Sequence, residues 1–195
     1  MQITTGQWLE SGDGTRWWFD SGALALDFAW TGPVNGEHLE TLHSPDDLGR
    51  WLAERFPRLD LSVDERELSD ALMLRAAIAG LAVGAVAGRP ATASDIDVVN
   101  LFAATPDLPP ALAGGSRQAG ASRVRPTQSL STIARDAVRI LGPDADGRIR
   151  ECSADDCTIV YLDTSRSGNR RWCSMQRCGN RAKVRAHRAR AQVSR

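Results

Sequence analysis

Four cysteines near the C-terminal end of the chain constrain its fold more than any other feature. They lie within 27 consecutive residues, as two C-x4-C pairs separated by fifteen residues. Two short loops that each carry a pair of thiolates can surround one zinc ion, which prefers sulfur ligands and a tetrahedral geometry. Because four thiolates fill the coordination shell, we expect one structural zinc ion. The predicted ligands are Cys152, Cys157, Cys173 and Cys178.

Two disulfides or four unrelated free thiols are the alternatives to zinc. The first residues, MQITTGQWLESGDG, have neither the basic nor the apolar region of a secretory signal, so we expect the protein in the reducing cytoplasm. That compartment disfavours disulfides, and the symmetric spacing disfavours unrelated thiols. The longest apolar run, residues 76–87, falls short of the roughly 18 to 20 residues that cross a bilayer, so we expect no membrane segment.

The residues around the cysteines predict a small ββα module. Residues 158–161 favour a strand, residues 163–169 are rich in turn formers, and residues 171–172 resume an extended run, so a hairpin is expected between the cysteine pairs. A helix is expected from residue 182 onward, with a stripe of small residues packed against the zinc core. The stripe consists of Ala182, Ala186, Ala189 and Val193.

Charge is distributed unevenly along the chain. Residues 1–147 hold 12 basic and 20 acidic side chains, whereas residues 148–195 hold 12 basic and only 4 acidic ones. A basic segment attached to an acidic body is typical of proteins that contact nucleic acid or another polyanion. The candidate nucleic-acid contacts are Arg170, Arg171, Arg177, Arg181, Lys183, Arg185 and Arg188.

Other interpretations of the basic segment remain open. An arginine-rich helix can simply be a solvated surface. The module can also be a zinc-stabilised protein–protein interaction module that docks on an acidic partner without binding nucleic acid. Arg181 faces either a phosphate or an acid such as Asp163 in these interpretations.

The N-terminal part predicts a mainly α domain with a small β element. Helix start and stop signals come from Ser44 with Pro45, a Ser62–Glu65 capping box, Thr92, and Gly142. The expected helices span about 44–56, 62–87, 92–103 and 127–141. A strand is expected at residues 22–30, paired with residues 16–19 or 122–125, and residues 105–122 are expected to form a loop.

Both parts of the chain resemble known families. The run YLDTSRSGNRRWCSMQRCGNRAKVRAHRAR, preceded by CSADDC, resembles the CGNR zinc finger, which implies zinc ligation by the four cysteines and a domain at 148–195. The segments ALALDFAW, SPDDLGRWL and LMLRAAI resemble the ABATE domain, which implies a domain at 1–145. Trp30 stands where that family usually has asparagine.

These resemblances imply a regulator of transcription. We expect it to bind nucleic acid, DNA rather than RNA, through the zinc finger, while the N-terminal domain senses a small-molecule effector or mediates homodimer formation. His38, His43 and His187 form no spaced set with acidic residues that is typical of a catalytic site. Neither a phosphate-binding glycine loop nor a nucleophile elbow occurs, so we do not expect an enzyme.

Overall fold

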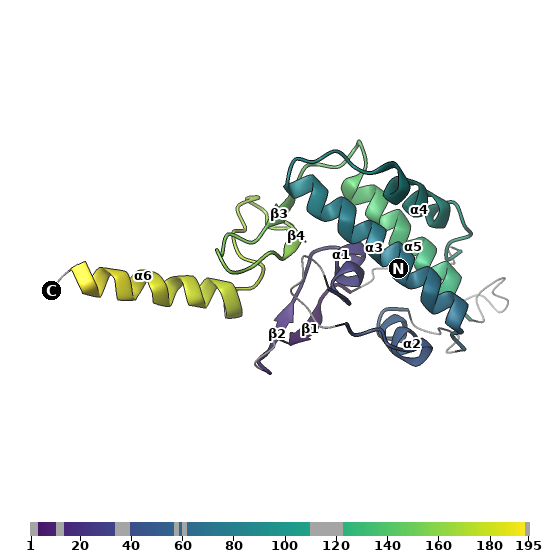
Figure 1. The fold of residues 1–195 in the computed structure, drawn as a ribbon, viewed down its shortest axis with the longest axis horizontal. Coiled ribbons are helices and arrows are strands. Elements are labelled where there is room, and N and C mark those ends of the chain that lie inside the picture. The colour runs from purple at the N-terminus through teal and green to yellow at the C-terminus, as the bar shows by residue number, and fades with distance from the viewer. Residues whose placement is uncertain are drawn as a thin grey trace.

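The structure is a computed structural model that describes residues 4–10, 14–33, 40–56, 59, 62–109 and 123–193. About half of the chain is helical, and two small antiparallel sheets of two strands each complete the fold. A bundle of helices occupies one end of the molecule, the zinc finger lies beside it, and the last helix projects away from both (Figure 1). The expected mainly α fold with a ββα zinc module is confirmed.

Three of the four expected helices lie where their capping residues predict them: α2 (Pro45–Ala53), α4 (Ala93–Ala103) and α5 (Pro126–Leu141). The side chain of Ser44 accepts a hydrogen bond from the backbone N–H at the third position of α2, and Thr92 does the same for α4. These bonds satisfy amide groups that have no partner inside the helix.

The fourth helix, α3 (Glu65–Val86), begins with a different capping box from the one expected. The side chain of Asp64 accepts from the backbone N–H of Glu67, and the side chain of Glu67 accepts from the backbone N–H of Asp64. The predicted box of Ser62 and Glu65 was therefore wrong by two residues, because Asp64 takes the extended backbone of a cap and leaves Glu65 as the first helical residue.

Helix α3 bears on the expectation that the chain has no membrane segment. With 22 residues it is long and apolar enough, by length and composition alone, to cross a membrane. In the structure it packs against α1, α4 and α5, and Leu74 and Ile78 on it are fully buried. The apolar stretch is therefore longer than residues 76–87, and the expectation of no membrane segment stays a prediction.

The strand expected at residues 22–30 was wrong, because this segment forms the short helix α1 (Leu24–Ala29). All six residues of α1 are buried, so no solvent-facing side imposes a helical period on the sequence. The carboxylate of Asp27 accepts hydrogen bonds from the backbone N–H groups of Gly6 at 2.6 Å and Ser21 at 3.3 Å. Burial nevertheless raises the pKa of Asp27 to about 6.

The small β element of the N-terminal domain is a hairpin of β1 (Gln7–Glu10) and β2 (Arg16–Phe19). The sequence predicts β2, but the partner expected for it was the segment 22–30. The observed partner is β1. Of the loop expected at residues 105–122, the part from 110 to 122 lies outside the described residues.

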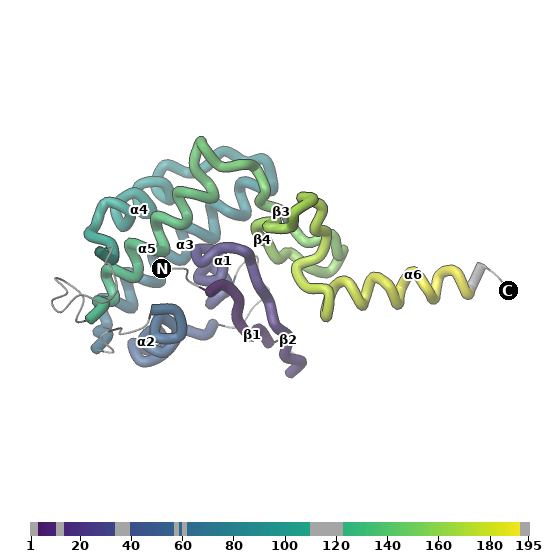
Figure 2. The backbone as a smooth tube through the Cα atoms, turned by 180° about the vertical axis from the view of Figure 1, so that it is seen from behind, coloured from purple at the N-terminus to yellow at the C-terminus, as the bar shows by residue number. Residues whose placement is uncertain are grey.

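The zinc finger packs directly on the helical domain through β4 (Val160–Leu162), which pairs with β3 (Ile149–Glu151). The indole N–H of Trp30 donates to the backbone oxygen of Val160 at 3.0 Å, and the N–H of Leu162 donates to the oxygen of Ser21 at 2.8 Å. Gly22 has a φ of +79°, and a Cβ there would lie 2.5 Å from the oxygen of Leu162. One continuous apolar core therefore joins the two parts. Their backbones lie side by side in Figure 2.

Candidate metal centre and nucleic-acid interface

The four cysteine sulfur atoms form one buried cluster and lie within 4.8 Å of one another. The Sγ atom of Cys173 is 3.7 Å from that of Cys157 and 3.5 Å from that of Cys178. A zinc ion with Zn–S bonds of about 2.3 Å holds neighbouring sulfurs about 3.8 Å apart, whereas a disulfide holds them at about 2.0 Å. The spacing therefore fits four-thiolate zinc ligation, and all four predicted ligands are brought together.

Backbone hydrogen bonds hold the two cysteine loops in this position. The N–H of Ser153 donates to the oxygen of Arg171 at 2.9 Å, which joins the first loop to the second. The N–H of Cys173 points at the sulfur of Cys152 at 3.4 Å, a contact that stabilises a thiolate. Because Arg171 pairs with the first loop, it forms no strand, and the hairpin predicted between residues 158–161 and 171–172 was wrong. The observed hairpin joins β4 to the upstream strand β3.

The electrostatics of the cluster favour a bound cation. Hydrogen bonds from the other three thiols hold the pKa of Cys178 far below its ordinary value, and the same neighbours raise the pKa of Cys173. The guanidinium of Arg181 also donates to the sulfur of Cys178 at 3.2 Å. Four buried thiolates repel one another, so full deprotonation requires a positive ion, and zinc supplies that charge at its centre.

Four of the seven predicted nucleic-acid contacts, Arg170, Arg177, Arg181 and Arg185, contact other parts of the protein. Arg170 donates to the backbone oxygens of Asp20 at 2.9 Å and Trp172 at 3.0 Å, and its guanidinium lies 4.2 Å from the centre of the Tyr161 ring. Arg177 lies 4.0 Å from the centre of the Trp17 ring. These contacts join the finger to the hairpin of the helical domain.

Asp156, not Asp163, is the acidic partner of Arg181. Arg181 and Arg185 both form ion pairs with Asp156, at 3.0 and 2.9 Å. Hydrogen bonds from Ser165 and Arg170 occupy the buried carboxylate of Asp163 instead. The remaining predicted contacts are exposed side chains, namely Arg171, Lys183 and Arg188.

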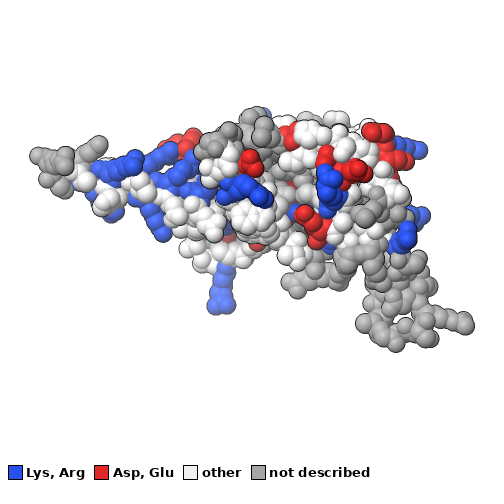
Figure 3. Space-filling model, turned by 90° about the horizontal axis from the view of Figure 1, so that it is seen from below, with Lys and Arg blue, Asp and Glu red and all other residues white. Residues whose placement is uncertain are grey.

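These exposed residues belong mainly to α6 (Asn180–Val193), which follows η1 (Met175–Gly179), a single π-helical turn. The expected packing of a small-residue stripe on the zinc core was wrong, because Ala182 is half-buried but Ala186 and Ala189 are exposed. The side chain of Val193 lies outside the described residues. The helix leaves the body after its first turn, and basic side chains gather over this narrow end (Figure 3).

A groove of about 620 Å³ lies between α6 and the hairpin. Thr15, Arg16 and Trp17 line one side of it, η1 forms its floor with Gln176 and Arg177, and α6 forms the other side. The arginines that line the groove are Arg16, Arg177, Arg181, Arg185 and Arg188. Arg16 could not be predicted from the sequence, because only the packing of the finger on the hairpin brings it beside α6.

Comparisons with known proteins match both parts of the chain. Residues 148–191 match the family model of the CGNR zinc finger. Residues 22–144, more than half of the chain, match the model of the ABATE family, whose description is "Putative stress-induced transcription regulator". The chain belongs to the ABATE family. A search of the curated proteins found no match.

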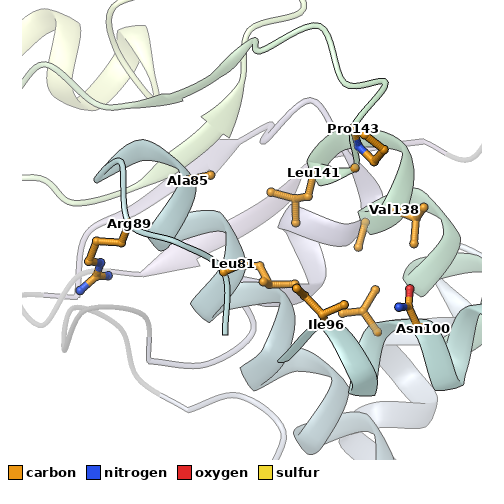
Figure 4. A pocket seen from close by; sticks show the side chains of 12 residues that line it. Leu81, Ala85, Arg89, Ile96, Asn100, Val138, Leu141 and Pro143 are labelled. Carbon is orange, nitrogen blue, oxygen red and sulfur yellow. The ribbon is translucent and has the colours of Figure 1, made fainter. Parts of the chain in front are cut away.

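The ABATE domain carries a second hollow, distant in sequence from the zinc site. It measures about 400 Å³ and lies between the C-terminal halves of α3 and α5 and the helix α4. Its lining is mainly apolar, with Leu81, Ile96 and Val138 pointing into it, while Asn100 and Arg89 lie at its edges (Figure 4). This composition suits a small apolar molecule with one polar or anionic group.

Proposed function

We propose that this protein is a transcription regulator that binds nucleic acid through its zinc finger, with DNA as the expected target and the cytoplasm as the expected location. The observation that carries the proposal is the groove lined by five arginines beside α6. Planar guanidinium groups make paired hydrogen bonds to phosphate oxygens, and a closely spaced set of them attracts a polyanion. The family description supports the regulatory role.

The groove holds more positive charge than the protein neutralises. Asp156 is the acidic residue that pairs with its arginines, and it serves Arg181 and Arg185 together. Two buried N–H groups on the lining, Arg177 Nη1 and Arg181 Nε, have no hydrogen-bond acceptor among the described residues. The donors that phosphate oxygens can reach are those of the exposed groove residues Arg185 and Arg188.

Zinc acts in this proposal by fixing geometry. When bound, it ties the loop of Cys152 and Cys157 to η1, so that α6 leaves the body in one direction. The arginines then meet the phosphates without further ordering of the finger, which favours affinity. This role is binding rather than catalysis.

The proposal is tested by fluorescence anisotropy of the zinc-loaded full chain with labelled nucleic acid at several salt concentrations. If about four to six phosphates are contacted, the slope of log affinity against log salt is roughly −4 to −5. Arg185→Ala combined with Arg188→Ala should reduce the magnitude of this slope by about 2 while zinc content stays unchanged. The matched control removes two arginines from the helical domain, as Arg50→Ala with Arg139→Ala, and should leave the slope unchanged.

A slope near zero, or equal losses in both double variants, refutes the proposal. In that case the basic finger is better explained as a module that docks on an acidic protein surface. That alternative predicts salt-sensitive association with protein and weak competition by nucleic acid.

We further propose that the hollow between α3, α4 and α5 binds a small-molecule effector. Its volume of about 400 Å³ and apolar lining are typical of small ligand sites, and its position near the end of α5 places it close along the chain to β3 of the finger. Small amphipathic carboxylates that raise the melting temperature of the protein, but not of a Val138→Arg variant, would support this role. The homodimer remains a prediction to be checked by sedimentation.

A further inference from the structure

We propose that the protein prefers unpaired nucleic acid, whose phosphates lie in the arginine groove while one base enters a neighbouring aromatic hollow. This inference rests on the proposed nucleic-acid binding and adds the class of target. The hollow measures about 580 Å³ and borders the arginine groove at Gln176 in η1. Its lining includes Trp18 from the hairpin and Arg171, Trp172 and Met175 from the finger.

The side chain of Trp18 points outward from the hairpin, although stability of the fold does not require an exposed tryptophan there. In the antiparallel pair, Trp8 stands opposite Trp18, and Leu9 stands opposite Trp17. Leu9 and Trp17 enter the core, whereas Trp8 is 58% exposed and Trp18 is 41% exposed. Two large aromatic side chains in contact on a surface typically mark a binding site, because exposed apolar patches otherwise favour aggregation.

The arrangement of the two tryptophans keeps Trp18 in a fixed orientation. Their ring centres are 5.7 Å apart with an interplanar angle of 75°, so the rings meet edge to face. Trp18 also lies against Gly6, where a Cβ would come within 2.4 Å of the indole. A ring held in this way loses little freedom when a base stacks on it.

Polar groups beside Trp18 match the needs of a base. Asn169 lines the same hollow and carries both donor and acceptor atoms, which suit the edges of an exposed base. The guanidinium of Arg171 lies 5.1 Å from the centre of the Trp172 ring and presents a second flat surface.

The hollow and the arginine groove adjoin, since Gln176 lines both. Proteins that bind single strands combine a cationic groove for the backbone with aromatic rings for the bases. In a duplex the bases are stacked and paired inside, so a base can enter the hollow only after leaving the stack. Single-stranded DNA and RNA share the required chemistry, and the hollow therefore favours either one over a duplex.

The test measures affinities of the zinc-loaded full chain for single-stranded DNA, RNA and duplex DNA of one sequence by fluorescence anisotropy. We expect single strands to bind at least about tenfold more tightly than the duplex. Because stacking on an aromatic ring contributes about 1 to 3 kcal/mol per base, Trp18→Ala should weaken single-strand binding about 5- to 150-fold and change duplex binding less than about twofold. Trp18→Phe should keep most of the affinity for single strands.

A matched control is Leu101→Ala, which removes an exposed apolar side chain of α4 far from the hollow in sequence. Zinc content and circular dichroism verify that each variant is folded. Tighter binding to the duplex, or equal losses for duplex and single strand in Trp18→Ala, refutes this inference while the proposed function stands. Absence of binding to all three nucleic acids refutes both.

Discussion

Arginines in the helical domain and arginines in the zinc finger have different kinds of partner. Three arginines on the helices each pair with a separate carboxylate. The pairs are Arg75 with Glu40, Arg135 with Asp107 and Arg139 with Asp136. In the finger, two arginines share Asp156, and others contact backbone oxygens, aromatic rings or a ligand sulfur. The helical domain has an excess of acidic side chains, whereas the finger has an excess of basic ones.

Arginine therefore has two roles in this protein: it forms surface ion pairs on the helices, and it joins the finger to the helical domain. Surface ion pairs on the helices contribute little to stability, and each one neutralises the arginine that takes part in it. Arg170 and Arg177, in contrast, fix the finger against the hairpin by contacts that do not remove their charge. Arginine side chains therefore both hold the finger in place and keep its net charge positive.

Removal of zinc should have the largest effect, because it should unfold the finger and leave the helical domain folded. Zinc binding contributes about 10 to 16 kcal/mol to the folding of small zinc modules, so Cys173→Ser should lose the metal and unfold residues 148–193. The helices should persist but melt at a lower temperature, because Trp30 loses its acceptor at Val160. Zinc assay, limited proteolysis and thermal melting by circular dichroism measure these effects.

The control for that variant is Ser167→Ala, a change at an exposed residue of the finger that is not a ligand. Full zinc content in Cys173→Ser would contradict the four-cysteine site. An unchanged melting temperature of the helices would contradict the shared core.

The two regions should also differ in how their stability depends on pH, because each contains a buried carboxylate, Asp27 in the helical domain and Asp163 in the finger. Burial raises the pKa of Asp27 to about 6, whereas hydrogen bonds from Ser165 and Arg170 outweigh burial and lower the pKa of Asp163. The stability that Asp27 contributes is fully present below about pH 4 and is lost as the pH rises through 6, by about 3 kcal/mol in total and roughly 1 kcal/mol between pH 5 and 7. Asp163 behaves in the opposite way. Its contribution to the free energy of unfolding is lost as the pH falls and the carboxylate becomes protonated.

Urea denaturation at pH 5, 6 and 7 measures this effect. The free energy of unfolding of wild type minus that of Asp27→Ala should decrease as the pH rises, because the variant lacks the titrating group. The matched variant Asp163→Ala should not show this decrease. A difference for Asp27→Ala that stays constant with pH would show that its carboxyl group is already ionised throughout.

The smallest expected effect comes from the single carboxylate that the finger arginines share. Asp156→Asn releases Arg181 and Arg185 from their ion pairs and should strengthen nucleic-acid binding about two- to fivefold at low salt, since a surface ion pair is worth less than about 1 kcal/mol. Asp155→Asn, at the neighbouring exposed residue, is the control for the change in net charge. Equal gains in both variants would assign the effect to overall charge.

Local signals in the sequence predicted several parts of the fold. Ser44 and Thr92 located helix starts because a cap acts on amides only two or three residues away. The spacing of the cysteines predicted the metal ligands for a similar reason, since zinc chemistry restricts which loops can carry them.

Signals that depend on distant contacts were not available in the sequence. Helix α1 was mistaken for a strand because complete burial removed its polar face. The partners of Arg170 and Arg177 could not be predicted, because Asp20 and Trp17 are more than 140 residues away along the chain. The same applies to Arg16 in the groove, which reaches α6 only through the packing of finger on hairpin.

The projection of α6 away from the body has a consequence for mutational tolerance. From Lys183 to Arg190 every side chain is exposed, so substitutions other than glycine or proline, away from the ion-paired Arg185, change stability by no more than about 0.5 kcal/mol. Residues that ligate zinc or join the finger to the hairpin have no such freedom. The outer faces of α6 can therefore change in sequence by successive single steps, each leaving the protein folded and its cysteine cluster intact.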